Sequence, residues 1–331
     1  MIENIAAIVP VGQIDQPCVA CGKLCLMPLI DVPGDPGPNR TMHRYVECPS
    51  CGTLAISEIP RDLGDYYRGD YYSFRPAIRP GIRRLFARLR NRQALEGNGI
   101  VAKAVDRFLP NYRLASLRPI CGGELCAGDP RALSFADIGC GGGALLREMR
   151  ELGYRKLTGI DPFMAEPAAE PGFRLIAGTI FEVDDRFDVV MFHHSLEHMT
   201  DPVSILRRTR ELLAPKGIAV VRVPLAGGFA WRTYGGEWSQ LDAPRHLWLF
   251  SENGFVSAAQ RTGWRVIKTV YDSTDYQFTG SELRRAGVNL AGRFSVKSIP
   301  ASQRRRFRRL AAELNAKRDG DQATFFLSPA Q

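Results

Sequence analysis

The chain has 331 residues and a formal net charge of +9, with 45% hydrophobic and 24% charged residues. Globular domains usually contain roughly 100–200 residues, so the length predicts about two domains, and the composition excludes a chain that is disordered throughout. No apolar stretch reaches the roughly 18 residues that a membrane span requires. The N-terminal segment lacks the basic region and apolar run of a secretory signal. We therefore expect a cytoplasmic protein.

Residues 14–60 are predicted to form a small zinc-ribbon domain. Two C-x-x-C-G motifs each present two thiolates, with backbone N–H groups turned toward the sulfur atoms. Tetrahedral Zn²⁺ takes four such ligands, which leaves no open coordination position, so the zinc is expected to be structural. Cys25 and His43 are alternative ligands that the second motif makes unnecessary. The expected ligands are Cys18, Cys21, Cys48 and Cys51.

Residues 61–130 are predicted to form a tyrosine-rich junction followed by a basic helical lid. Residues 79–119 contain ten Lys or Arg and two acidic residues, and residues 293–310 contain seven Lys or Arg and no acidic residue. Such basic segments attract phosphates or anionic head groups, or they are simply solvated helix faces. A peripheral contact with an anionic membrane is therefore one of the possible partner interactions.

Residues 131–331 are predicted to form an α/β domain. Short apolar runs alternate with helical patterns up to residue 272, which is typical of βαβ units and a parallel sheet with helices on both faces. A mostly helical insertion is expected at about 273–320, and a final strand follows it.

The strongest functional signal is the glycine-rich turn between Phe135 and Gly143. It follows a predicted strand and precedes a helix, so a ligand can lie against its backbone and the helix N-terminus. Its spacing also matches the weak dinucleotide fingerprint G-x-G-x-x-G/A. However, Asp137 precedes the first glycine by two residues, where a carboxylate would face the cationic end of a ligand rather than a pyrophosphate, and the turn contains no Lys or Arg.

The D-x-G-x-G-x-G turn resembles that of class I S-adenosylmethionine (SAM)-dependent methyltransferases, and the resemblance extends from about residue 133 to residue 267. It implies a doubly wound, Rossmann-like, seven-stranded sheet whose last strand is antiparallel, with SAM as cofactor. It also implies that Asp161 receives the ribose hydroxyls, because a carboxylate has about four lone-pair sites. Many relatives carry an Asp or Asn after the third strand, where this chain has Thr179–Ile180. The cofactor-binding residues are thus expected to be Asp137, Gly139, Cys140, Gly141, Gly143, Asp161, Pro162, Phe163, Thr179, Ile180 and His193.

A zinc ribbon before a SAM domain resembles a subgroup that methylates nucleotide-linked sugars and related glycans. In that subgroup a His-Glu-His segment after the fifth strand supplies the base; here His246 matches its second histidine, whereas Arg245 and Pro244 replace the other two residues. These departures argue against C-methylation and favour a shorter relative acting on a hydroxyl or an amine, while a carbon acceptor stays open. The catalytic candidates are His246 and His194, and the substrate-binding candidates are Arg245, Trp238, Tyr67, Tyr71, Tyr72 and His198.

The sequence therefore predicts a SAM-dependent methyltransferase whose acceptor is a small molecule, such as a sugar or glycan precursor bearing a phosphate or carboxylate. An RNA methyltransferase is an alternative that the basic segments allow, but nothing resembles an RNA-binding module, so nucleic acid is not the expected partner. A non-catalytic SAM-fold protein that binds a partner is a second alternative, which the intact Asp137 turn and Asp161 disfavour.

Overall fold

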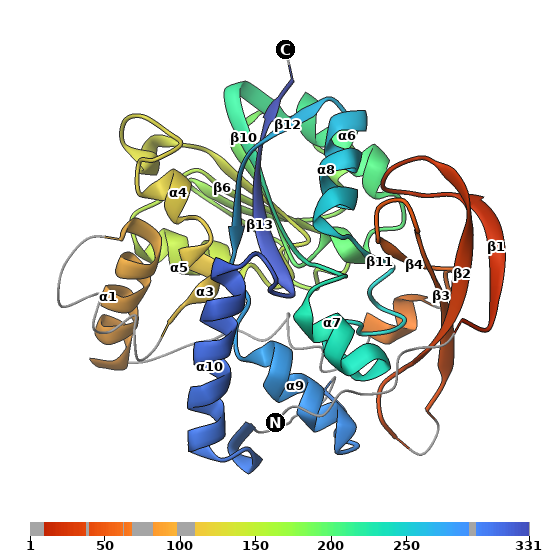
Figure 1. Ribbon diagram of the computed structural model, residues 1–331. Coiled ribbons are helices and arrows are strands. Elements are labelled where there is room, and N and C mark those ends of the chain that lie inside the picture. Colours follow the sequence, from red (N-terminus) through yellow and green to blue (C-terminus); the bar gives the residue numbers. More distant parts are fainter. Residues whose placement is uncertain are drawn as a thin grey trace.

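The computed structural model of the protein describes residues 10–37, 40–61, 63–67, 82–97, 110–290 and 296–330. These residues form two β-sheets: a large central sheet with helices packed on both faces, and a smaller sheet built mainly from the N-terminal strands (Figure 1). The smaller sheet lies beside the larger one, as the red strands of Figure 1 show.

The larger sheet has eight strands in the order β12-β13-β10-β9-β5-β6-β8-β7. Five neighbouring strands, from β8 to β10, are parallel, and β13 is antiparallel to both β10 and β12. In chain order the five parallel strands are arranged 3-2-1-4-5, as in doubly wound sheets. The strands are β5 (Phe135–Ile138), β6 (Leu157–Asp161), β7 (Ala168–Glu170), β8 (Phe173–Ala177), β9 (Phe187–His193), β10 (Leu213–Pro224), β12 (Trp264–Tyr271) and β13 (Gln322–Pro329).

The antiparallel final strand is confirmed, but the predicted count of seven strands is wrong by one. The extra strand is β7, which pairs antiparallel with β8 at the edge of the sheet. Its three residues, Ala-Ala-Glu, are too few to show an alternation of apolar and polar side chains, so they give no strand signal. The strand forms because Gly172 adopts a positive φ of 70° that turns the chain back.

Both faces of the central sheet are buried, which explains why its strands are nearly continuous apolar runs. In β9, Val190 and Phe192 face one core cluster, whereas Val189 and Met191 face another. The first cluster includes side chains of α6 (Pro202–Glu211) and α8 (Glu252–Arg261). The helices that contribute to the second are α1 (Ile82–Glu96), α3 (Tyr112–Ala115), α4 (Arg118–Cys121) and α5 (Ala144–Glu151).

The smaller sheet is antiparallel and contains a strand from a distant part of the sequence. Its strands are β1 (Gly12–Pro17), β2 (Leu24–Pro33), β3 (Met42–Glu47), β4 (Leu54–Ile56) and β11 (Trp248–Leu249). Because β11 pairs with β4, the loop that follows β10 completes the N-terminal sheet. The two parts of the protein are therefore joined by backbone hydrogen bonds.

A third core cluster lies between the smaller sheet and three helices: α7 (Phe229–Tyr234), α9 (Tyr276–Arg285) and α10 (Ala301–Ala316). The last two belong to the predicted helical insertion. Phe278 of α9 stacks on Phe307 of α10 with ring centroids 5.1 Å apart. Single 3-10 turns complete the described elements: η1 (Leu63–Tyr67), η3 (Pro130–Ala132), η4 (Ile180–Glu182), η5 (Leu196–His198), η6 (Gly235–Glu237) and η7 (Val296–Ser298).

Helix α1, which lies in the predicted basic segment, packs on one face of the central sheet. Its C-terminal residues Ala94 and Leu95 are fully buried against α3, α4 and α5 on one face of the central sheet. Leu85, Phe86 and Leu89, nearer its N-terminus, are more than half exposed. The basic part of the helix therefore extends beyond the core.

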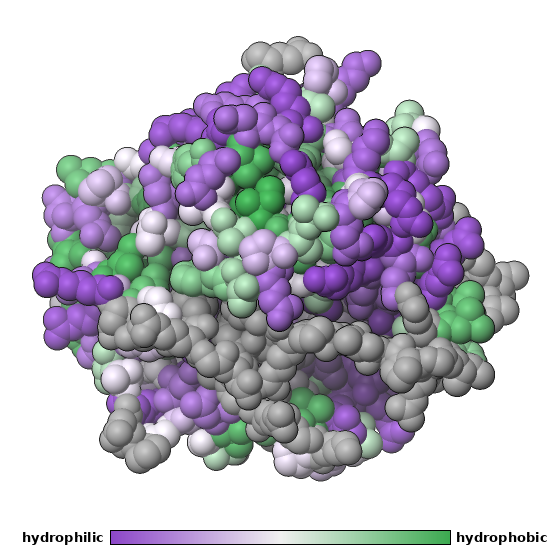
Figure 2. Space-filling view, turned by 180° about the vertical axis from the view of Figure 1, so that it is seen from behind, coloured by the Kyte–Doolittle hydropathy of each residue, from purple (hydrophilic) through white to green (hydrophobic). Residues whose placement is uncertain are grey.

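Within the described residues, no helix combines the length and the hydropathy that crossing a bilayer would require. On the face drawn in Figure 2, hydrophobic residues form small separate groups among hydrophilic ones. The described residues visible on this face therefore form no continuous apolar band.

Candidate cofactor and metal sites

The glycine-rich turn connects β5 to α5, and its backbone conformation explains its glycines. Gly139 and Gly141 have φ values of 75° and 55°, a region that side chains disfavour. A Cβ atom on Gly139 would lie 2.5 Å from the Cβ of Ser195. Because glycine has no side chain, the backbone of the turn can lie directly against the loop that follows β9.

Asp161 lies at the carboxyl end of β6, beside the turn. One carboxylate oxygen accepts a hydrogen bond from the backbone N–H of Gly141 at 2.9 Å, and the other accepts one from that of Phe163 at 2.8 Å. Each oxygen has a second lone pair, so the carboxylate can still accept two hydroxyl groups. A carboxylate with one acceptor position left on each oxygen can bind a vicinal diol.

Asp137 lies at the end of β5 and is fully buried. Its Oδ1 has no hydrogen-bond partner among the described residues. Burial raises the pKa of Asp137 to about 7, an effect that the charge of Arg113 opposes and that of Asp161 reinforces. A buried carboxylate in this state is stabilised by a cationic ligand.

A cavity of about 390 Å³ lies at the carboxyl ends of these strands. Open α/β sheets bind ligands at this edge. The cavity brings together nine of the residues that the sequence analysis selected. They are Gly139, Gly141, Asp161, Pro162, Phe163, Thr179, Ile180, His194 and His198.

Two aromatic side chains flank the part of the cavity beyond Asp161. Phe163 and Phe181 are 52% and 55% exposed, which leaves their rings accessible to a planar ligand. Thr179 caps η4 in a capping box, in which its backbone N–H donates to Glu182 at 2.7 Å. The capped turn fixes the backbone at Thr179–Ile180, the position for which the sequence offered no acidic side chain.

Three other residues that were predicted to bind the cofactor lie behind this lining. Gly143 is the N-cap of α5, and the Sγ atom of Cys140 lies close to Gly159. Both ring nitrogens of His193 are buried and lack partners among the described residues. Burial, followed by the charge of Arg222, lowers the pKa of His193 well below its usual value, so its imidazole is neutral.

His194 and Glu197 form a pair at the cavity wall. His194 Nδ1 lies 3.2 Å from a Glu197 carboxylate oxygen, and the His194 side chain remains 25% exposed, whereas that of Glu197 is fully buried. His194 has a positive φ of 54°, which its backbone hydrogen bond to Arg222 O at 2.9 Å holds in place. Such strained conformations of residues other than glycine cluster at functional sites.

His246 lies behind His198 rather than on the described lining of the cavity. The two rings are 4.7 Å apart in an edge-on arrangement. The side chain of His246 is only 7% exposed, and its Nδ1 donates to the carbonyl of Gln240 at 2.7 Å. His198 therefore separates His246 from the described part of the cavity.

Two substrate-binding candidates are buried elsewhere. Arg245 forms ion pairs with Asp35 and Asp242, which neutralise its charge. Trp238 is fully buried and donates from Nε1 to Asp321 at 3.0 Å. Neither side chain lines the cavity. Both belong to the packing between the smaller sheet and the helices.

The remaining substrate candidates are the junction tyrosines. Tyr71 and Tyr72 lie outside the described residues, as does the side chain of Tyr67. The cavity lining does include Leu63 and Gly64, at the start of η1. The junction thus reaches the cavity through residues that the sequence analysis did not select.

Sequence reasoning missed further lining residues on the segment after β9. This segment was selected only for its histidines, although every residue at the carboxyl end of a parallel strand is a candidate for the site. That position is the signal that could have identified them. The missed residues are Ser195, Met199, Thr200, Asp201 and Ile205.

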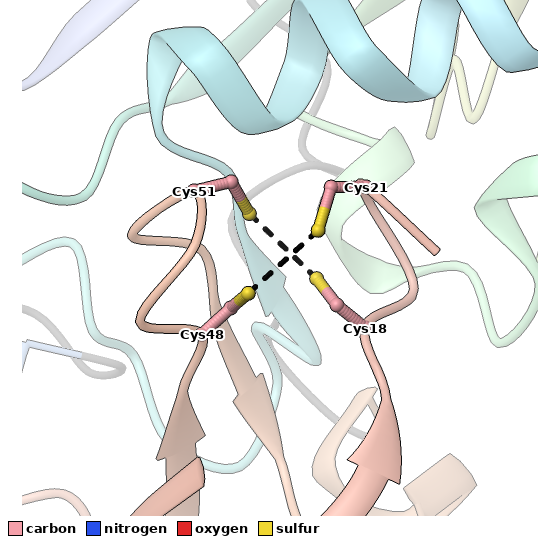
Figure 3. A group of neighbouring side chains, drawn as sticks. All are labelled: Cys18, Cys21, Cys48 and Cys51. Atoms are coloured by element: carbon pink, nitrogen blue, oxygen red, sulfur yellow. Dashed lines mark hydrogen bonds between the residues drawn. The ribbon is translucent and has the colours of Figure 1, made fainter. Parts of the chain in front are cut away.

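The four cysteines of the C-x-x-C motifs converge at one end of the smaller sheet (Figure 3). One pair lies in the turn between β1 and β2, and the other lies in the turn between β3 and β4. Backbone groups of Ala20 and Cys21 hydrogen-bond to the Cys18 sulfur, and those of Ser50 and Cys51 to the Cys48 sulfur. The two turns therefore present their thiols in the same way.

The spacing of these sulfur atoms fits a tetrahedral metal. Sγ atoms of opposite turns lie 3.7 Å apart in two pairs, Cys18–Cys51 and Cys21–Cys48. Zn–S bonds of about 2.3 Å in a tetrahedron place sulfur atoms about 3.8 Å apart. Cys25 also approaches, with its Sγ 3.8 Å from that of Cys48, whereas Cys121 lies in the core near α5.

Comparison with known proteins shows which family the region around the cavity matches. A family model described as a methyltransferase domain matches residues 77–269, which include the glycine-rich turn, Asp161 and the segment after β9.

Curated relatives match the same region. A ubiquinone biosynthesis O-methyltransferase of Ruegeria pomeroyi is 35% identical over 27% of this chain and 40% of its own length. One of Azorhizobium caulinodans is 32% identical over 40% of this chain and 54% of its own length. The chain thus spans about half the length of the curated relatives that it matches.

Among solved structures, one similar chain is a Burkholderia thailandensis 1,6-didemethyltoxoflavin-N1-methyltransferase with bound S-adenosylhomocysteine. It is 14% identical, covers 90% of this chain and 100% of its own, and has a TM-score of 0.40.

Proposed function

The chain belongs to the family of proteins with a methyltransferase domain, and we propose from this premise that it transfers the methyl group of SAM to a hydroxyl group of a small molecule. The observation that carries the proposal is the cavity at the glycine-rich turn. Its edge holds a carboxylate that can receive two hydroxyls, and behind it lies a buried carboxylate oxygen that has no hydrogen-bond partner among the described residues.

The residues of the cavity suit the parts of SAM. Asp161 accepts both ribose hydroxyls, and the bare backbone at Gly139 and Gly141 allows the cofactor to approach the turn. Asp137 receives the cationic amino group, since its ionised form needs a positive partner in a buried place. Phe163 and Phe181 flank the adenine, whose edge meets the backbone at Thr179–Ile180.

His194 is proposed as the base. When bound, SAM supplies a methyl group on a sulfonium, so the protein has to align the acceptor oxygen and receive its proton. His194 lines the cavity, and its Nδ1 donates to Glu197, which leaves Nε2 to accept a proton from the hydroxyl. His246, the other candidate, lies behind His198 and away from the described lining.

A hydroxyl acceptor is favoured by two observations. The two curated relatives described above are named O-methyltransferases, and a base at the cavity wall suits the removal of a hydroxyl proton. Their names refer to ubiquinone biosynthesis, so they lend no support to the sugar or glycan acceptor favoured by the sequence analysis. Arg245, predicted to bind an acceptor phosphate, is already paired with two carboxylates.

The four clustered cysteines are proposed to bind one structural Zn²⁺. The support is the sulfur spacing of 3.7 Å and the presence of four thiols in a closed set. The ion would hold the β1–β2 and β3–β4 turns together at the end of the smaller sheet.

The function is tested by calorimetric titration of SAM and by measuring S-adenosylhomocysteine formation with panels of phenols, catechols, sugars, amines and carbon acids. We expect one SAM per chain and turnover with hydroxyl acceptors. The absence of SAM binding would overturn the proposal, and turnover confined to amines or carbon acids would overturn the choice of a hydroxyl.

A further inference from the structure

A row of polar side chains crosses the central sheet at the edge where its parallel strands end, on the face that packs against α3 and α5. Met191 of β9 and Val220 of β10 belong to the core cluster of this face. Because side chains alternate between the two faces along a strand, His193 and Arg222 lie on the same face, beyond the core. The backbone of Arg222 is paired with His193 on one side and with Thr324 of β13 on the other. Three neighbouring strands therefore place these polar side chains next to one another.

Arg222 is buried and held in one orientation by Asp272, which directly follows β12. The Arg222 side chain is only 5% exposed, and its Nε donates to a carboxylate oxygen of Asp272 at 2.6 Å. Thr324 Oγ1 donates to the same oxygen at 3.2 Å, and Gln322 Nε2 donates to the other oxygen at 2.8 Å. Three donors thus hold the carboxylate in place, and the carboxylate in turn orients the guanidinium.

The two terminal NH₂ groups of Arg222 have no acceptor. Asp272 accepts from Nε, and no described residue accepts a hydrogen bond from either terminal group. A buried donor without an acceptor is unfavourable, and more so when it carries a charge. This side of the guanidinium therefore lacks a partner that a ligand would supply.

His193 is a second polar group on this face without a partner. Both of its ring nitrogens are buried and lack hydrogen-bond partners among the described residues. Burial lowers the pKa of His193, so its ring is neutral and has one N–H donor. Asp137 of β5 lies on the same face and is paired with Met191, two residues before His193. In strand order, His193 thus lies between Asp137, proposed to receive the SAM amino group, and Arg222.

We propose that Arg222 and His193 bind a carboxylate group of the methyl acceptor. This inference rests on the proposed function and deepens it. SAM bound as proposed occupies the ends of β5, β6 and β8, so the ends of the neighbouring strands β9 and β10 remain for the acceptor. The terminal edge of a guanidinium presents two parallel N–H groups, which match the two oxygens of a carboxylate.

The charges around His193 favour a carboxylate over a phosphate. The positive charges of Arg222 and Arg113 both act on His193, and Asp272 is the acidic residue paired with Arg222. One added negative charge leaves this group neutral. A phosphate ester carries about 1.5 to 2 negative charges at pH 7, which would leave an excess of negative charge in a buried place.

The test compares carboxylic acids with their uncharged amides, in the presence of S-adenosylhomocysteine so that no methyl transfer occurs. Calorimetry on the zinc-loaded full chain measures binding of 3-hydroxybenzoate against 3-hydroxybenzamide, and of glucuronate against glucuronamide. We expect one acid to bind about 10-fold or more tightly than its amide, and Arg222→Gln to abolish this preference. Arg265→Gln, which changes an exposed arginine of β12, is the matched control and should keep it. No preference for the acid in either pair would overturn the proposal.

The affinity for SAM separates two sources of a carboxylate, because SAM carries one of its own. Arg222→Gln should leave the affinity for SAM unchanged. A 10-fold loss of SAM affinity with unchanged binding of the acid would assign Arg222 to the cofactor and overturn the proposal.

A crystal structure of the wild type with S-adenosylhomocysteine and the preferred acid gives a result that does not depend on a variant folding. The acid carboxylate is expected within hydrogen-bond distance of the Arg222 terminal nitrogens, and a carboxylate bound elsewhere would overturn the site. Binding of the acid at Arg222 by a chain that does not bind SAM would instead overturn the proposed function and leave the carboxylate site in place.

Discussion

The two walls of the cavity are built in different ways. The wall beneath the proposed cofactor comes from short contiguous segments, in which the glycine-rich turn and Asp161 follow directly from the ends of β5 and β6. A second wall, at His194 and His198, is supported by a loop that is held by the N-terminal sheet. Tyr45 Oη donates to the His246 carbonyl at 2.6 Å, and the backbone N–H of Ile56 donates to Leu247 O at 2.9 Å.

The first wall therefore depends on residues that are close together in sequence, whereas the second depends on contacts between residues that are far apart in sequence. Changes in the first wall should alter cofactor affinity and leave the rest of the protein intact. Changes in the cysteine cluster should reach the second wall through β11, because β11 is a strand of the N-terminal sheet. The following changes test that distinction, beginning with the largest expected effect.

Loss of the proposed zinc site should have the largest effect. Cys48→Ser is expected to abolish stoichiometric zinc and to unfold the N-terminal sheet, since structural zinc in small peptides contributes about 10–16 kcal/mol of apparent binding free energy. Metal analysis and thermal unfolding measure both outcomes. Cys25→Ser is the matched control, because Cys25 lies beside Cys48 but outside the set of four. Full zinc content in Cys48→Ser would exclude the proposed ligand set.

His194→Ala should lower turnover by about 10²–10⁴-fold, the contribution typical of a general base. SAM affinity should not change, because the proposed role of His194 concerns the acceptor proton. Steady-state kinetics and calorimetry separate the two effects. His43→Ala serves as a control in β3. A variant that keeps wild-type turnover would remove His194 from the mechanism.

Asp161→Ala should weaken SAM binding by about 1.5–3 kcal/mol, as expected for lost hydrogen bonds to a charged group. The measurement is calorimetry, and Asp184→Ala is the control because the Asp184 side chain is 94% exposed. Unchanged affinity in Asp161→Ala would contradict the assignment of the ribose site.

SAM affinity should depend on pH through Asp137. Because burial raises the pKa of Asp137 to about 7, its carboxylate is mostly protonated at pH 6 and mostly ionised at pH 7.5. Binding of a cationic amino group should therefore weaken by about eight-fold from pH 7.5 to pH 6, as one-proton linkage requires. Asp137→Asn should remove most of this dependence, and a slope that persists in that variant would assign the titration to another group.

The smallest expected effect concerns the contact between the N-terminal sheet and the loop. Tyr45→Phe removes the hydroxyl that donates to His246 O and should cost about 0.5–1.5 kcal/mol of unfolding free energy. Chemical denaturation measures this. An unchanged unfolding free energy would show that the other contacts alone hold the loop.

The same distinction explains what the sequence could predict. Asp137, the glycines of the turn and Asp161 lie within 25 residues of one another, and their proposed roles follow from their places at the ends of two strands. The C-x-x-C motifs likewise carry their own local geometry. By contrast, Trp238 and Arg245 were predicted to bind the substrate, but both side chains are buried and already have partners. Trp238 donates to Asp321, and Arg245 is paired with Asp35, which is more than 200 residues away in sequence. Local patterns do not encode such tertiary partners.

The most direct test of the account is a crystal structure of the protein with S-adenosylhomocysteine. The account predicts both ribose hydroxyls within hydrogen-bond distance of the Asp161 carboxylate, the amino group near Asp137 Oδ1, and the sulfur facing His194. A ligand bound elsewhere, or bound at the turn with its ribose away from Asp161, would contradict it.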